Sequence, residues 1–143
     1  MNRDAADLHR AFTDACNDHD LAAIRRLLDP RVTAWRPGHG VARGIDAVLD
    51  RWAGDFAAFP DLTIASSLVL TQGSSVFSEY EVRGTRTGPL ERCATDGDGP
   101  GAHIVLRASS VEEWRDGRLV ASRTYWDHYD LLRQLGVLPA VPA

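Results

Sequence analysis

The segment VEEWRDGRLV, residues 111–120, continues into ASRTYWD, residues 121–127, and this stretch decides the fold. Both halves have the composition of β-strands, and Asp116-Gly117 stands between them. Because glycine readily adopts the positive φ of a tight type I′ turn, Asp-Gly between two such runs is a strong signal for a β-hairpin. The second run ends on the carboxylate of Asp127, and a short helix-like tail follows at residues 129–136.

Around this hairpin the chain places helices first and strands after them. Apolar residues at helical spacing predict two helices within residues 1–29, separated at residues 17–20, where Asp20 is a suitable N-cap for the second. A third helix is expected from Gly44 to Phe59. The expected strands, most of them marked by an apolar period of two, are residues 31–35, 62–70, 76–86, 103–114 and 118–126.

Helices grouped before a run of hairpins indicate an α+β fold with a segregated helical layer. The length of 143 residues suits a single domain over residues 1–143 with a core of its own. A curved antiparallel sheet wrapped on the N-terminal helices forms a cone with an open mouth. Such a hollow is a natural pocket for a mostly apolar small molecule.

Composition argues against several classes of partner. The net charge of -4 and the lack of a basic run disfavour nucleic-acid binding. No apolar run approaches the roughly 20 residues needed to cross a bilayer. Residues 1–7 lack the apolar core of a signal peptide, so we expect a cytoplasmic protein without membrane contact. Every basic residue is arginine, which excludes Schiff-base chemistry on a lysine.

The cysteines and histidines do not have the spacing of metal ligands. Cys16 and Cys93 are far apart and are expected to be free thiols, with Cys16 in the core and Cys93 in a polar, Gly-rich loop at residues 87–102. The composition of this loop makes it a candidate lid. Paired cysteines, His-x-x-x-His and Glu-x-x-His do not occur, so we expect no metal or other cofactor.

Four segments resemble the SnoaL-like polyketide cyclases, a branch of the nuclear transport factor 2-like superfamily. They are FPDL (59–62), GTRTG (84–88), DGRLV (116–120), and the tail from Asp127 through LLRQLG (131–136). The resemblance covers roughly residues 5 to 138. It implies the cystatin-like α+β barrel of that superfamily, and a homodimer is expected because such dimers are common in this fold.

The same resemblance implies an activity. Cyclases of the SnoaL-like family close a ring in a polyketide ester by intramolecular aldol condensation, without metal or cofactor. The catalytic acid/base is the aspartate that opens the tail, which is Asp127 in this chain. Where many relatives have histidine in the mid-chain Gly-Thr-His-Thr-Gly segment, this chain has Arg86.

Strand alternation suggests how Asp127 would meet a substrate. It places Arg123, Tyr125 and Asp127 on one face of the last strand, and we expect that face to line the pocket because such groups fit poorly in a dry core. Abstraction of a proton beside a carbonyl needs a base whose pKa is raised toward neutrality, which apolar walls achieve by desolvation. Arg123 is positioned to bind the enolate oxygen or an ester carbonyl. Tyr125 would orient a substrate oxygen or simply pack.

The other residues expected at the pocket are Trp35, His39, Trp52, Phe56, Phe59 and Tyr80. Trp52, Phe56 and Phe59 form one apolar face of the third helix and its end, and Tyr80 is expected to be a further apolar wall. Trp35 and His39 flank the loop at the mouth, where His39 is the second titrating candidate because imidazole ordinarily titrates near pH 6.5. The remaining histidines that look superficial are His9, His19 and His128.

Two other functions remain open. Epoxide opening, which this fold also hosts, needs an acid and a base flanking a water, and Asp127 and Glu113 on adjacent strands are the candidate pair. A binding or dimerisation module without chemistry is expected if aromatic side chains fill the cone and Asp127, a favoured N-cap residue, merely caps the tail helix. Dimerisation is expected through the outer face of the sheet, where Trp114 and Trp126 are placed.

Overall fold

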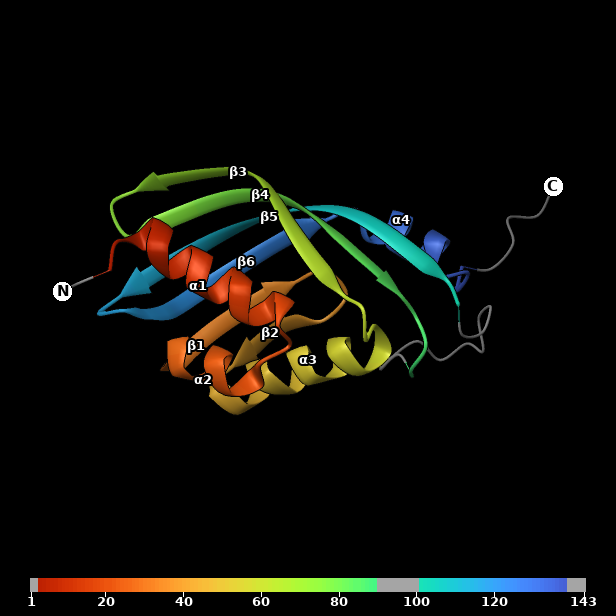
Figure 1. Ribbon diagram of the computed structural model, residues 1–143, viewed down its shortest axis with the longest axis horizontal. Coiled ribbons are helices and arrows are strands. Elements are labelled where there is room, and N and C mark those ends of the chain that lie inside the picture. Colours follow the sequence, from red (N-terminus) through yellow and green to blue (C-terminus); the bar gives the residue numbers. More distant parts are fainter. Residues whose placement is uncertain (1–2, 90–100, 139–143) are drawn as a thin grey trace.

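The computed structural model describes residues 3–89 and 101–138, and Cys93 with most of the 87–102 loop lies outside this range. Within the described residues, four helices and six strands follow one another (Figure 1). They are α1 (Ala5–Asn17), α2 (Leu21–Leu27), β1 (Leu28–Arg36), β2 (Gly40–Arg43), α3 (Ile45–Ala58), β3 (Thr63–Gln72), β4 (Ser75–Thr85), β5 (His103–Arg115), β6 (Arg118–Trp126) and α4 (His128–Gln134).

The strands form one curled sheet in the order β2-β1-β6-β5-β4-β3. All neighbours are antiparallel except β1 and β6, which run parallel. Figure 1 shows the long strands arching over the helical layer, with α1 beneath β3 and β4 and α3 against β1 and β2. The predicted α+β cone is confirmed. The short strand β2 was not expected from the sequence.

Local signals explain where the elements begin and turn. The Asp20 side chain accepts a hydrogen bond from the Ala23 N–H at 3.0 Å and caps α2, as predicted. The β5–β6 turn has φ of 52° at Asp116 and 76° at Gly117, and two positive φ angles define the predicted type I′ geometry. The turn of the hairpin that joins the two central strands, β5 and β6, is therefore set by two adjacent residues.

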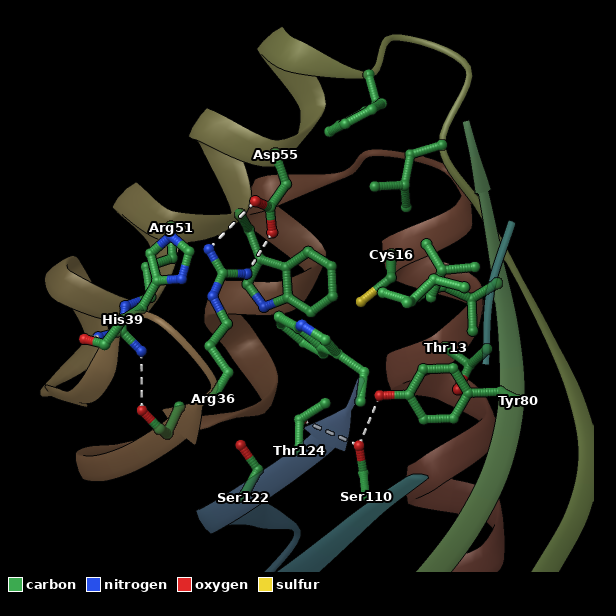
Figure 2. A pocket seen from close by; sticks show the side chains of 18 of the residues that line it. Thr13, Cys16, Arg36, His39, Arg51, Asp55, Tyr80, Ser110, Ser122 and Thr124 are labelled. Carbon is green, nitrogen blue, oxygen red and sulfur yellow. Dashed lines mark hydrogen bonds and ion pairs between the residues drawn. The ribbon is translucent and has the colours of Figure 1, made fainter. Parts of the chain in front are cut away.

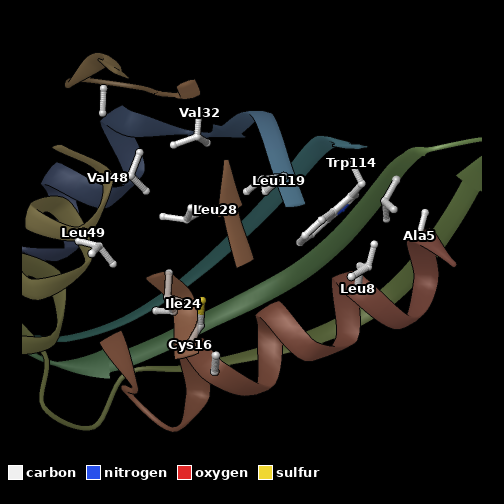
Figure 3. Packing of buried hydrophobic residues seen from close by; sticks show 13 residues of the cluster. Ala5, Leu8, Cys16, Ile24, Leu28, Val32, Val48, Leu49, Trp114 and Leu119 are labelled. Carbon is white, nitrogen blue, oxygen red and sulfur yellow. The ribbon is translucent and has the colours of Figure 1, made fainter. Parts of the chain in front are cut away.

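The core lies between the helices and the concave face of the sheet (Figure 3). Its fully buried side chains include Ile24, Leu28, Val32, Val76 and Leu119. Burying each large apolar side chain contributes about 1.5–3 kcal/mol. Cys16 is 1% exposed in this cluster, which confirms its predicted place in the core.

A second cluster joins the end of α3 to the tail. Phe59, Leu62, Ile104 and Leu135 are buried together there. The Gln134 side chain also pairs with the β5 backbone, because its Nε2 donates to the Val105 carbonyl at 2.9 Å while its Oε1 accepts from the Val105 N–H at 2.8 Å. These contacts hold α4 against the sheet. No helix within the described residues is long and apolar enough to span a membrane.

Candidate active site

A pocket of about 240 Å³ opens between the helices and the concave face of the sheet. Side chains from α1, β1, α3, α4 and the inner face of strands β3 to β6 line it. Most of the lining is apolar, and polar groups are gathered in a few places, as in small-molecule sites generally. Its apolar walls include Phe12, Val48, Trp52, Phe59, Ile64 and Leu106.

The last strand presents its other face to this pocket. Ser122, Thr124 and Trp126 line the hollow, whereas Arg123 and Tyr125 are not part of the lining. Tyr125 is 47% exposed and packs its ring against Trp35 at 5.3 Å between ring centres. The alternation was predicted correctly but the choice of face was wrong. Both faces carry polar groups, so polarity alone could not identify the inner one.

Asp127 caps the tail helix and is not among the pocket-lining residues. Its Oδ1 accepts a hydrogen bond from the Asp130 N–H at 3.0 Å, which is the N-cap interaction of α4. The residue is exposed. The expectation that its carboxylate looks into an apolar hollow is therefore wrong. The alternative weighed from the sequence, a capping aspartate, describes its geometry.

The other expected carboxylate, Glu113, also lies away from the pocket. Its side chain is 46% exposed and sits 3.6 Å from Arg123 on the outer face of the sheet. The proposed epoxide-opening pair of Asp127 and Glu113 therefore does not face a common hollow. The expectation that Trp114 and Trp126 lie on the outer face of the sheet is wrong, because Trp114 is 3% exposed in the core and Trp126 lines the pocket. Homodimerisation through the outer face of the sheet stays a prediction, and residues other than these two tryptophans would form the interface.

Of the other aromatic residues and the histidine expected at the pocket, all but Phe56 line it. Trp35, His39, Trp52, Phe59 and Tyr80 line the hollow. Phe56 does not, and its ring stacks on that of His19, in the turn between α1 and α2, at 4.1 Å between ring centres. His19 also bonds through Nε2 to the Leu62 carbonyl at 2.9 Å, so it is a structural residue rather than the free surface histidine expected.

An ion pair stands beside His39 at one side of the pocket (Figure 2). Arg36 donates from both terminal nitrogens to Asp55, at 2.6 and 3.2 Å, and the two side chains are 17% and 26% exposed. The Nε of Arg36 is buried, and within residues 3–89 and 101–138 it has no hydrogen-bond partner. Burial and the Arg36 charge lower the pKa of His39 below its usual value.

The loop that carries His39 is fixed by a neighbouring arginine. Arg51 of α3 donates to the carbonyls of Ala34, His39 and Gly40 at 2.8 to 3.0 Å. Gly38 has φ of 76°, and a Cβ placed there would lie 2.5 Å from the His128 ring. His128 itself lines the pocket and accepts from the Trp126 indole N–H at 3.2 Å, which corrects its expected place at the surface.

A hydroxyl chain crosses the sheet side of the pocket. The Tyr80 hydroxyl lies 2.7 Å from Ser110 Oγ, which lies 3.0 Å from Thr124 Oγ1. Burial raises the pKa of Tyr80, so the phenol stays protonated at neutral pH. Figure 2 shows Tyr80 directed from β4 toward this chain, on the other side of the hollow from His39 and Arg36.

A buried pair that the sequence reading missed completes the polar lining. His9 and Glu112 are 6% and 5% exposed, and His9 Nδ1 lies 2.9 Å from Glu112 Oε1. The Trp114 indole N–H donates to the same oxygen at 3.0 Å. His9 was expected at the surface, yet it stands three and seven residues before Phe12 and Cys16, which is the spacing of one helix face. That spacing could have found it.

Known proteins share both the sequence pattern and the fold of this chain. A model of the SnoaL-like polyketide cyclases matches residues 6–135. The chain belongs to the SnoaL-like polyketide cyclase family. None of the curated proteins matches the sequence.

Several solved structures have a fold similar to that of this chain. IdmH of Streptomyces antibioticus, a candidate polyketide cyclase, is 26% identical with a TM-score of 0.80, and the match covers 94% of this chain and 99% of IdmH. A candidate polyketide cyclase of Pseudomonas putida is 20% identical with a TM-score of 0.84, over 94% of this chain and 99% of the other. An epoxide hydrolase of M. tuberculosis is 18% identical with a TM-score of 0.71, over 92% and 88%.

Proposed function

We propose that this family member closes a ring in a polyketide-like substrate by an intramolecular aldol reaction, with His39 as the base. The observation that carries the proposal is a half-buried imidazole in the pocket wall whose pKa is lowered by burial and by Arg36. A histidine with a lowered pKa is neutral at pH 7 and is ready to accept a proton. Asp127, the acid/base implied by sequence resemblance, lies outside this wall.

The hydrogen bond of His39 determines which nitrogen would act. Its Nδ1 lies 3.2 Å from the Pro37 carbonyl oxygen, which can only accept. The neutral ring therefore carries its proton on Nδ1, and Nε2 keeps the free lone pair. In the proposed first step Nε2 takes a proton from the carbon beside a substrate carbonyl, and the electron pair of that C–H bond becomes the enolate.

Arg36 supplies the charge that an enolate needs. Its guanidinium is permanently protonated, and its two bonds to Asp55 fix its plane at the pocket wall. The unpartnered Nε–H is a donor available to the enolate oxygen. The enolate carbon then attacks a second carbonyl of the same substrate, a C–C bond forms, and the new alkoxide takes the proton from the His39 imidazolium.

The apolar walls would bring the two reacting carbons together. Trp52, Phe59 and Tyr80 are aromatic residues that were expected at the substrate from the sequence and that line the pocket. Aromatic walls favour a folded apolar chain by excluding water, and they hold the reacting groups in one orientation. The proposed substrate is accordingly an apolar polyketide ester with at least two carbonyl groups.

Incubation with linear polyketide esters tests this proposal directly. Ring closure by the aldol reaction leaves the mass unchanged, so a product of equal mass and shorter retention, with a new ring by NMR, is the expected result. His39→Asn should reduce the rate by about 10²- to 10⁴-fold, the usual contribution of a general base. His103→Asn is the matched control, because His103 is exposed, does not line the pocket, and hydrogen-bonds through Nδ1 to the Thr85 hydroxyl at 3.0 Å. Equal rates in all three proteins would contradict the proposal.

A further inference from the structure

The buried pair of His9 and Glu112 is not used by the reaction proposed above. Both residues line the pocket, and their side chains are each 7% exposed. The carboxylate has two nitrogen neighbours on one oxygen, His9 Nδ1 at 2.9 Å and Trp114 Nε1 at 3.0 Å. On the other side of the imidazole, His9 Nε2 is buried and has no hydrogen-bond partner among the residues that the structure describes. A buried polar atom without a partner is uncommon in native proteins, and a bound water or ion or a catalytic role is a usual explanation for one.

The hydrogen bonds indicate which atoms of this pair donate and which accept. Indole N–H can only donate, so Glu112 Oε1 is an acceptor toward Trp114. An ionised carboxylate oxygen accepts a second bond readily, and the Nδ1–H of His9 supplies it. When the imidazole is neutral with its proton on Nδ1, the other nitrogen, Nε2, holds a lone pair. The pair has the arrangement in which a carboxylate orients a histidine so that its other nitrogen accepts a proton.

The neighbouring titratable groups do not compete for that role. Cys16 and Tyr80 both feel the Glu112 charge, and burial together with this charge raises the pKa of each. Both groups therefore stay protonated at neutral pH. Ser110 and Glu112 lie on the same face of β5, two residues apart, and Ser78 on β4 is paired with Ser110. The Ser78 hydroxyl is also buried, and it has no hydrogen-bond partner in the part of the chain that the structure describes. The pocket thus offers an acceptor nitrogen and an unpartnered hydroxyl.

We propose that His9 and Glu112 form a second site in this pocket, one that binds and deprotonates an acidic phenolic or enolic hydroxyl group of the ligand. The hydroxyl O–H bond breaks, its electron pair stays on the oxygen, and the proton forms an N–H bond at His9 Nε2. The imidazolium that results is held by the Glu112 carboxylate, and the ligand oxygen is an anion hydrogen-bonded to Nε2–H. This deepens the proposed function by naming the substrate class, a polyketide with a hydroxylated aromatic or enolic end.

The probe for this site is 4-nitrophenol, because its anion is yellow and its neutral form is not. Purified full-length protein is titrated with the phenol at a pH where the free compound is mostly protonated, and the phenolate band is followed by absorbance. We expect the band to appear on binding. In His9→Leu the band should vanish and the dissociation constant should rise about tenfold, as loss of a charged hydrogen bond predicts.

Two further variants keep the test decisive if His9→Leu folds poorly. His9→Leu combined with Glu112→Leu removes both polar partners, so no unpaired charge is left buried. Glu112→Gln keeps an acceptor for Trp114 and His9 but removes the charge, so the phenol should bind in its neutral form. Glu113→Gln, on the outer face of the same strand, should bind 4-nitrophenol as the wild type does.

Three results would overturn the assignment. They are a wild-type protein that binds no 4-nitrophenol, one that binds only the neutral phenol, and a phenolate band that survives in the double variant. Loss of the band in Arg36→Met but not in His9→Leu would place the anion at Arg36 instead. Ring closure is measured separately through His39→Asn, so a phenolate band without turnover would reject the proposed reaction while retaining this site.

Discussion

Two carboxylates in the pocket each bind a nitrogen-containing side chain, and the two pairs differ in burial and in the chemistry that they allow. Asp55 holds Arg36 in a pair that is about one-fifth exposed, whereas Glu112 holds His9 in a pair with 7% exposure on each side. The Arg36 and His9 side chains each have one buried nitrogen that has no hydrogen-bond partner among the described residues. A guanidinium stays charged and can only stabilise an anion, while an imidazole can also take up a proton. The Arg36 pair can therefore stabilise an anion, whereas the His9 pair can in addition take up a proton.

The largest expected effect comes from breaking the deeper pair. Glu112→Ala leaves the His9 and Trp114 N–H groups buried without their acceptor, and it also opens a cavity. Removing one partner of a buried pair costs about 3–5 kcal/mol. Urea denaturation should show this loss in the free energy of unfolding. Glu113→Ala on the exposed face is the matched control and should change it by less than about 0.5 kcal/mol. Similar losses in both variants would mean that the buried pair has no special role.

Breaking the shallower pair should cost less. Asp55→Asn leaves the Arg36 guanidinium without its ionised partner, but water reaches both side chains and reduces the penalty to about 1–2 kcal/mol. Asp46→Asn is the control on the same helix, because its partner Arg25 is 55% exposed and the pair contributes little. If Asp55→Asn destabilises as much as Glu112→Ala, the difference between the two pairs is not one of burial.

The aspartate outside the pocket should matter for stability alone. Asp127→Ala removes the N-cap of α4 and should destabilise the protein by about 1 kcal/mol, whereas Asp127→Asn keeps a good cap and should be nearly neutral. Thermal denaturation of the two variants distinguishes these outcomes. An equal loss in both would show that the charge of Asp127, rather than its hydrogen bond, stabilises the helix.

The smallest effect is a pH dependence that His39 contributes. Its pKa in the folded protein lies below the ordinary value of 6.5, so the unfolded chain takes up a proton first as the pH falls. Folding stability should therefore decline as the pH drops through about 6.5, until the folded protein is also protonated. His39→Asn should flatten this part of the curve, and Arg36→Met should raise the His39 pKa in an NMR titration. An unchanged titration would separate the two residues.

Local features of the fold were predictable because neighbouring residues determine them. The cap at Asp20 and the turn at Asp116-Gly117 depend on the conformations of adjacent residues, and both were confirmed. The third helix was expected between Gly44 and Phe59, and these residues are its two caps. Strand β2 was missed because four residues, GVAR, carry no periodic signal, and only pairing with β1 defines it.

The site was harder to predict because it depends on which face the helices cover. A period of two separates Arg123 and Tyr125 from Ser122 and Thr124, but it does not say which set is inside. A register shift between β5 and β6 then places Leu119 on the inner face with Ser122, three residues away. Family resemblance led to a helix-capping aspartate, while spacing along α1 and β5 would have led to the buried pair.

The most direct test compares turnover of one linear polyketide ester by His39→Asn and Asp127→Asn, with the free energy of unfolding of both variants measured alongside. The account predicts that both fold, that His39→Asn loses about 10²- to 10⁴-fold in rate, and that Asp127→Asn retains the wild-type rate. Loss of turnover in a stably folded Asp127→Asn, with His39→Asn unimpaired, would contradict it.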